Sequence, residues 1–82
     1  MYMRLDKYLK VSRIIKRRTV ANEACDAGRV LVNGKVARAS YDVKIGDCIE
    51  IAFGTRNFKA EVLTVQETVK KDDAAAMYKV ID

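Results

Sequence analysis

The stretch Gly28-Arg29-Val30-Leu31-Val32-Asn33-Gly34-Lys35-Val36 is where the sequence changes from a helical to a strand-like pattern. Asn33-Gly34 lies between β-forming residues and is the strongest short-range hairpin signal, because a type I′ turn needs positive φ at both central positions. Gly28 lacks a Cβ and enters the left-handed region at little cost, so it predicts the end of a preceding helix. The stretch therefore predicts a helix that stops at Gly28, followed by a β-hairpin.

Two short amphipathic helices are predicted before Gly28. In the first, Leu5, Tyr8 and Leu9 recur at helical spacing, with basic residues on the other side of the projection. The pattern breaks at about Ser12, and residues 13–18 form a basic connection that contains a buried-looking pair, Ile14 and Ile15. The apolar arc of the second helix consists of Val20, Ala21, Ala24, Cys25 and Ala27.

The residues after the hairpin predict further antiparallel strands. Ile45-Gly46-Asp47 predicts a turn, and the strand Cys48–Phe53 then places Ile49, Ile51 and Phe53 on one face. Another strand follows a turn at 54–57, and its change of apolar phase predicts a bulge near Val62. Asp72 or Asp73 is expected to cap a final helical turn over 74–77, and Val80 and Ile81 are expected to be extended.

These elements predict an α+β fold in which two N-terminal helices pack on a small antiparallel sheet. The chain has 82 residues, which predicts a single domain over 1–82. The expected core is formed by Leu5, Leu9, Ile15, Val20, Ala24, Leu31, Ile49 and Ile51.

The composition argues against an enzyme. The chain has no histidine, which removes the commonest general base, the commonest metal ligand and every Ser-His or Cys-His pair. Its four glycines are scattered singly, without a dinucleotide-binding fingerprint or a phosphate-binding loop. We therefore expect no catalytic residues, no metal site and no cofactor.

The two cysteines and the hydropathy pattern indicate where the protein resides. Cys25 and Cys48 form no Cys-x-x-Cys pair, so two reduced thiols that behave as small apolar side chains are expected. No stretch approaches the roughly 18 consecutive apolar residues of a membrane helix, and no secretion signal precedes the first helix. The sequence predicts a cytoplasmic monomer with no membrane contact.

Positive charge is concentrated in the N-terminal half. Residues 1–40 contain ten basic and three acidic side chains, whereas residues 41–82 contain six basic and eight acidic ones. A folded domain with one basic half is typical of a polyanion-binding surface, although a surface that serves only solubility is the simpler alternative. Seven of the cations fall within the first 18 residues, which favours nucleic acid as the partner.

The basic connection between the helices is the candidate site. The N-terminus of the second helix adds free N–H donors and a partial positive charge, both of which favour phosphate. Arginine matters here because its planar fork binds phosphate oxygens bidentately. Asp6 is the exception in this basic region: it either pairs with Lys10 one turn later or orients a neighbouring arginine toward RNA.

Four blocks in order resemble the S4 RNA-binding domain over roughly residues 3–53. They are Arg4-Leu5-Asp6-Lys7-Tyr8-Leu9, Ser12-Arg13-Ile14-Ile15-Lys16-Arg17-Arg18, Gly28 to Gly34, and Gly46-Asp47 before Ile49. C-terminal strands and a short helix are expected over about 54–82.

Within the family, the chain is most similar to small stand-alone bacterial members that act in ribosome-associated quality control. The run Ala74-Ala75-Ala76-Met77-Tyr78 resembles their tails, and the end at Asp82 lacks the basic extension of a related fifteen-kilodalton heat-shock protein.

The resemblance implies a function and a set of partners. A protein of this kind binds the RNA of the large ribosomal subunit and peptidyl-tRNA, works with a nascent-chain tailing factor, and supports C-terminal tailing of stalled chains. The matching motif positions are Arg4, Asp6 and Arg18, with Lys7, Arg13, Lys16 and Arg17 as supporting phosphate contacts. Two alternatives stay open: a heat-shock-type ribosome recycling factor, and the RNA-binding subunit of an RNA-modifying enzyme. A DNA-binding regulator is disfavoured, because no base-reading recognition helix is visible.

Overall fold

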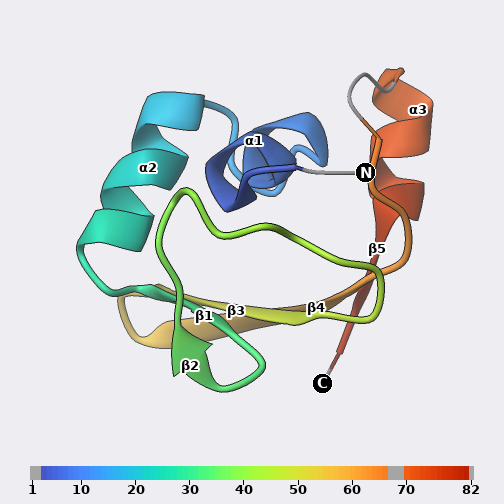
Figure 1. Cartoon of the computed structure of the whole chain (residues 1–82). Helices are drawn as coiled ribbons and strands as arrows, with labels where there is room; N and C mark the ends of the chain where they lie inside the picture. Colours follow the sequence, from blue (N-terminus) through green and yellow to red (C-terminus); the bar gives the residue numbers. More distant parts are fainter. Residues whose placement is uncertain (1–2, 67–69, 82) are drawn as a thin grey trace.

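In the computed structural model, which describes residues 3–66 and 70–81, three helices lie on one side of a five-stranded antiparallel sheet (Figure 1). The strand order is β2-β1-β3-β4-β5, with every pair antiparallel. The ends of the predicted 1–82 domain, residues 1–2 and 82, lie outside the described residues. The helices are α1 (Leu5–Val11), α2 (Arg18–Asp26) and α3 (Lys71–Ala74), and the strands are β1 (Val30–Val32), β2 (Lys35–Val36), β3 (Cys48–Phe53), β4 (Arg56–Val62) and β5 (Tyr78–Val80). The predicted α+β fold class is confirmed.

The helix pair α1 and α2 forms where the sequence predicts it. In α1, Leu5, Tyr8 and Leu9 are fully buried, and Ser12 is the C-terminal cap residue. In α2, only Ala21 and Cys25 of the predicted apolar arc are buried. Val20 is 47% exposed, so its place in the expected core is wrong, and Ala27, the other exposed member of the arc, is the C-terminal cap residue. Val20 lies at the edge of the narrow stripe by which this nine-residue helix packs.

The hairpin and the helix stop are also confirmed. Asn33 and Gly34 have φ values of 54° and 83°, the positive values that a type I′ turn requires. Gly28 has φ +74° and follows the end of α2, as expected of a residue that terminates a helix. β1 and β2 pair across this turn with Leu31 opposite Val36.

β3 and β4 form the centre of the sheet, with Ile49 opposite Ala60 and Ile51 opposite Phe58. Ile49 and Ile51 are buried, but Phe53 is exposed because the strand runs past the end of the core. β4 ends at Val62. Directly after it, the N–H groups of Leu63 and Thr64 both donate to the Met77 carbonyl oxygen, at 2.8 and 3.2 Å, so two residues oppose one, as in the bulge expected near Val62.

The C-terminal segment returns to the sheet. α3 is followed by a 3-10 turn, η1 (Ala75–Met77), and by β5, which confirms that Val80 is extended, while Ile81 lies just after the strand. The predicted aspartate cap is wrong. Lys70 is the N-cap residue, and Asp72 and Asp73 lie inside the first turn, where a negative charge still stabilises the helix dipole.

The core lies between the helices and the sheet. Leu5, Leu9, Ile15, Ile49 and Ile51 are buried as predicted, whereas Ala24 and Leu31 are only half-buried. Leu31 occupies the strand position whose side chain alternates away from the helices. The core residues that were absent from the expected core are Met3, Tyr8, Ala21, Cys25, Val30, Val32, Ala37, Ala39, Val43, Val62 and Met77. The Tyr8 hydroxyl donates to the Met77 carbonyl oxygen at 2.9 Å, which ties α1 to the C-terminal segment.

Cysteine replacement is expected to affect stability but not binding. Cys25 is buried, Cys48 is half-buried, and both are free thiols. Burial, together with the charges of Asp6 and Asp26, raises the pKa of Cys25 to about 11, so the thiol is protonated at neutral pH. A double Cys→Ala variant should lose about 1–2 kcal/mol of unfolding free energy, measured by urea denaturation, and should keep the ribosome binding that the family resemblance implies. A folded variant that no longer binds would contradict this prediction.

Candidate nucleic-acid interface

Asp6 is a buried carboxylate that connects the two helices. Its side chain is 3% exposed and accepts hydrogen bonds from the Lys7 backbone N–H at 2.8 Å and the Asn22 amide at 3.2 Å. Arg4 donates to it through Nε at 3.2 Å and Nη2 at 3.3 Å. Arg18, in the first turn of α2, lies with its Nε 3.4 Å from Asp6 Oδ2. One carboxylate thus contacts two arginine side chains, one from the residue before α1 and one from α2.

The charge state of Asp6 follows from these partners. Burial alone raises the pKa of a carboxyl group, but the hydrogen bonds from Asn22, Arg4, Arg18 and the Lys7 N–H outweigh that effect and lower the pKa of Asp6. The group is therefore a carboxylate at neutral pH. Of the two roles left open for Asp6, orientation of arginines is the one that the geometry supports.

The two arginines remain available to a ligand. The side chains of Arg4 and Arg18 are 42% and 48% exposed, so each guanidinium contacts Asp6 and also faces solvent. A shallow depression of about 380 Å³ lies beside Arg18 and is lined by Asp6, Arg18, Thr19, Asn22 and Glu23. The two side chains therefore have the fixed position and the exposure that phosphate recognition by arginine requires.

Asn22 is a member of this cluster that sequence reasoning missed. It lies four residues after Arg18, so both side chains point from the same face of α2 toward α1. Its position on the polar arc was visible in the sequence. Its contact with a buried aspartate from another helix was not visible in the sequence, because such a contact depends on how the helices pack.

The structure places the other predicted cations on or beside the connection between the helices. Arg13, Lys16 and Arg17 are exposed, whereas Lys7 is half-buried on α1. Arg13 has φ +64°, a left-handed conformation that is unfavourable for a residue with a Cβ. It occupies the position just after the α1 cap, where this conformation ends a helix and reverses the chain. The connection therefore presents its basic side chains around a sharp turn.

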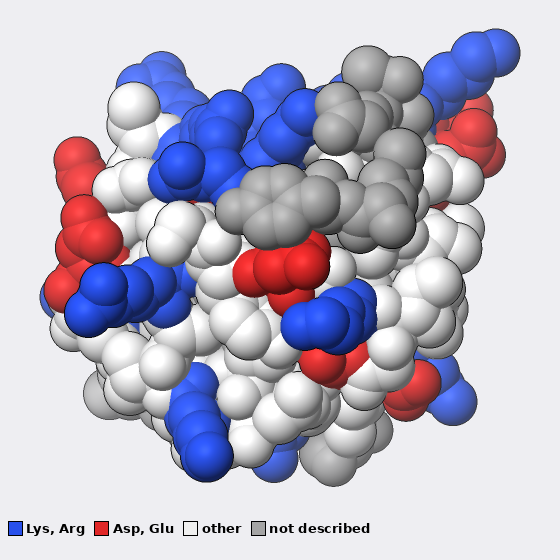
Figure 2. Space-filling view, in the orientation of Figure 1, with Lys and Arg blue, Asp and Glu red and all other residues white. Residues whose placement is uncertain are grey.

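The distribution of charge agrees with this placement. Figure 2 shows blue side chains densest along the upper edge of the molecule, above α1 and α2, with others scattered over the lower front, and red side chains at the left, near the centre and at the right. We call this surface the helix face and define it by Arg4, Asp6, Lys7, Arg13, Lys16, Arg17, Arg18 and Asn22.

Over residues 3–66 and 70–81 no helix is long and apolar enough to span a bilayer. Within the same part of the chain, no group of three or more Cys, Asp or Glu side chains is arranged to hold a metal ion.

The sequence of residues 3–49 matches the model of the S4 domain, which covers more than half of the chain. The chain therefore belongs to the S4 domain family, as the four sequence blocks predicted.

Particular relatives are similar over nearly the whole length. A Streptococcus pneumoniae protein named "RQC P-site tRNA stabilizing factor" is 57% identical over 79 residues, which cover 96% of this chain and 90% of that protein. The Bacillus subtilis protein of the same name is 51% identical over 96% of this chain and 92% of its own length. Among solved structures, the trimeric Vibrio cholerae heat shock protein 15 superposes with a TM-score of 0.90 and 27% identity, over 99% of this chain and 83% of that one.

Proposed function

We propose that this protein binds the large ribosomal subunit that carries a stalled peptidyl-tRNA, and that it supports C-terminal tailing of the nascent chain. The observation on which the proposal rests is the pair of half-exposed arginines, Arg4 and Arg18, held by the buried carboxylate of Asp6. Relatives more than 50% identical over almost the whole chain are named for stabilising P-site tRNA, which supports the choice of target.

The proposed mechanism is binding without chemistry. The helix face docks on folded RNA, with Arg4 and Arg18 donating to phosphate oxygens and the exposed cations Arg13, Lys16 and Arg17 adding further phosphate contacts. Contacts of this kind recognise folded RNA by its backbone, shape and 2′-hydroxyl groups rather than by base sequence. A protein bound to both ribosomal RNA and tRNA restrains the tRNA position while residues are added to the nascent chain.

The salt dependence of binding tests whether the helix face neutralises phosphates. If three to five phosphates are neutralised, a plot of log affinity against log salt should have a slope of roughly −2 to −5. The measurement is co-sedimentation with large ribosomal subunits over a series of potassium chloride concentrations. An affinity that does not change with salt would mean that the basic half is only a solubility surface.

A second candidate function, ribosome recycling after heat stress, is favoured by the close superposition with heat shock protein 15. Partner proteins separate the two functions. The quality-control function predicts co-purification with peptidyl-tRNA and a tailing factor from unstressed cells. Recovery only with subunits from heat-stressed cells, without the tailing factor, would favour recycling instead.

A further inference from the structure

A second buried carboxylate, Asp47, organises a different part of the surface. Asp47 is 7% exposed and accepts hydrogen bonds from the Tyr41 hydroxyl at 3.0 Å, the Asn33 amide at 3.1 Å and the Lys44 backbone N–H at 2.9 Å. Asn33 in turn accepts a hydrogen bond from the Cys48 N–H at 2.9 Å. The β1–β2 turn and the Tyr41 ring are therefore fixed to the same group.

The Tyr41 ring borders a groove between the β1–β2 hairpin and the loop that follows it. We call this the hairpin groove; it has a volume of about 650 Å³ and is lined by Val32, Asn33, Lys35, Val36, Ala37, Arg38, Ser40 and Tyr41. The volume lies within the roughly 300–1,000 Å³ of sites that hold small organic groups. Its walls combine an aromatic ring, apolar side chains, an amide and two cations.

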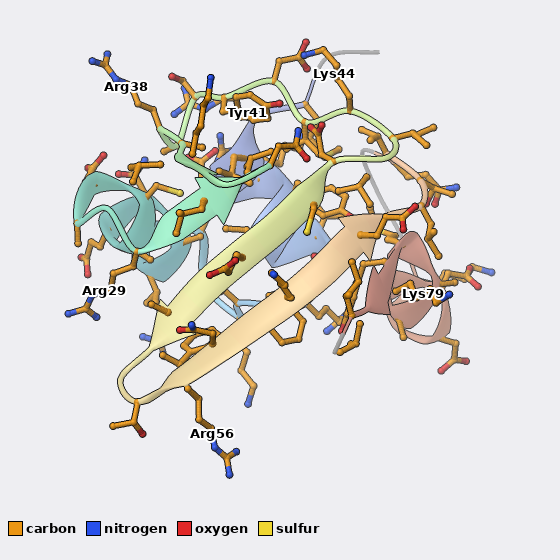
Figure 3. The ribbon with its side chains drawn as sticks, turned by 90° about the horizontal axis from the view of Figure 1, so that it is seen from below. Arg29, Arg38, Tyr41, Lys44, Arg56 and Lys79 are labelled. Carbon is orange, nitrogen blue, oxygen red and sulfur yellow. The ribbon has the colours of Figure 1, made fainter. Side chains whose placement is uncertain are left out.

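Cations flank Tyr41 along its loop, whereas the carboxylate of Asp47 contacts only its hydroxyl and Asp42 is the next residue in the chain. Figure 3 shows Arg38 and Lys44 extending outward on either side of Tyr41 along the same loop. The ammonium group of Lys44 lies 5.4 Å from the centre of the Tyr41 ring, which further restricts the ring. Val36, 64% exposed on β2, provides an apolar surface across the groove. An aromatic ring with flanking cations is the usual platform for an unstacked base and its phosphates.

The hairpin groove is next to the helix face. The loop runs beside the start of α1, where the Leu5 N–H donates to the Tyr41 carbonyl oxygen at 2.8 Å and the Asp6 N–H to the Ala39 carbonyl oxygen at 3.1 Å. Arg38 is therefore the residue directly before Ala39, whose carbonyl oxygen accepts the hydrogen bond from the Asp6 N–H. An RNA strand bound to Arg4 and Arg18 can continue into the groove without leaving the protein surface.

We propose that the hairpin groove takes one unpaired nucleotide of the bound RNA, with its base stacked on Tyr41 and its phosphates on Lys35 and Arg38. This inference rests on the proposed function and extends it, because it gives the protein a second RNA contact specific for a single-stranded position. Apolar walls beside a fixed ring favour a base over a simple phosphate.

Tyrosine substitutions test the stacking. Tyr41→Leu should weaken binding to large ribosomal subunits that carry peptidyl-tRNA by about fivefold to hundredfold. Tyr41→Phe loses the hydrogen bond to Asp47 but keeps the ring, so it should bind nearly as well as the unmodified protein once its thermal stability has been checked. Arg38→Gln should weaken binding, and Arg56→Gln, which removes an exposed arginine at the far end of the sheet in Figure 3, should not.

Ultraviolet cross-linking gives an independent readout. Trypsin cleaves after Arg38 and Lys44 and releases the peptide Ala39–Lys44, which contains Tyr41. A nucleotide adduct on this peptide is the expected result. The proposal is overturned if Tyr41→Leu binds as tightly as the unmodified protein, or if Tyr41→Phe is as weak as Tyr41→Leu at equal stability. In either case, if Arg18→Ala still weakens ribosome binding, the proposed function stands. If Arg18→Ala binds ribosomes as tightly as the unmodified protein, the proposed function is contradicted.

Discussion

Asp6→Ala is expected to weaken binding to large ribosomal subunits by about tenfold or more, although it removes a negative charge from an RNA-binding surface. The carboxylate is 3% exposed and is bound by Arg4 and Arg18. Without it both arginines regain rotamer freedom, which they must lose again to bind phosphate. If bulk charge alone governed binding, the same substitution would strengthen it, because the net charge becomes more positive. The two models therefore predict effects of opposite sign.

Glu50→Ala is the matched control for this experiment. Glu50 lies on β3, and its carboxylate is 3.7 Å from the ammonium group of Lys59 on β4, so the substitution also removes an acidic partner of a cation. It changes the net charge by the same amount as Asp6→Ala but leaves the helix face intact. Co-sedimentation should show weakened binding for Asp6→Ala alone. Equal or tighter binding by a folded Asp6→Ala variant would show that Asp6 does not position the arginines for RNA.

Local signals predicted most of the fold. Asn33-Gly34 and Gly28 determine turns because these residues adopt positive φ at little cost. This preference is local and does not depend on how distant parts of the chain pack. The errors occur where a side chain's environment depends on the whole molecule. Val20 has the right period for a core position, but Val20 and Phe53 both line an open depression of about 430 Å³ between α2 and β3, and each remains about half exposed.

Less of the candidate site than of the fold was predictable from the sequence. Charge clustering and the family motif identify Arg4, Asp6 and Arg18, but neither shows that Asp6 is buried between two helices. Burial of a carboxylate requires partners from separate elements, here Asn22 and Arg18 on α2. The network of Asp47, Tyr41 and Asn33 joins three segments in the same way and gives no periodic signal in the sequence.

Arg18→Ala is expected to weaken ribosome binding by about tenfold to hundredfold, equivalent to the loss of a charge-assisted contact of about 1.5–3 kcal/mol. The contact of Arg18 with Asp6 uses Nε, so the two terminal nitrogens can donate to an RNA phosphate. Arg18→Lys should restore only part of the affinity, because an ammonium group keeps the charge but cannot make a bidentate contact. Folding should change little: the Arg18 side chain is about half exposed, and an ion pair of that kind contributes at most about 1 kcal/mol.

The decisive comparison measures sedimentation with large subunits for the unmodified protein, Arg18→Ala, Arg18→Lys and Arg56→Ala. Arg56 begins β4, is exposed, and lies opposite Phe53 in the sheet, so its loss removes one positive charge at a distance from α1 and α2 (Figure 3). If phosphate is bound at a fixed site, only the substitutions at Arg18 should matter at constant salt. If Arg56→Ala weakens binding as much as Arg18→Ala, the total charge of the domain governs binding, and the arrangement around Asp6 serves only to join α1 to α2.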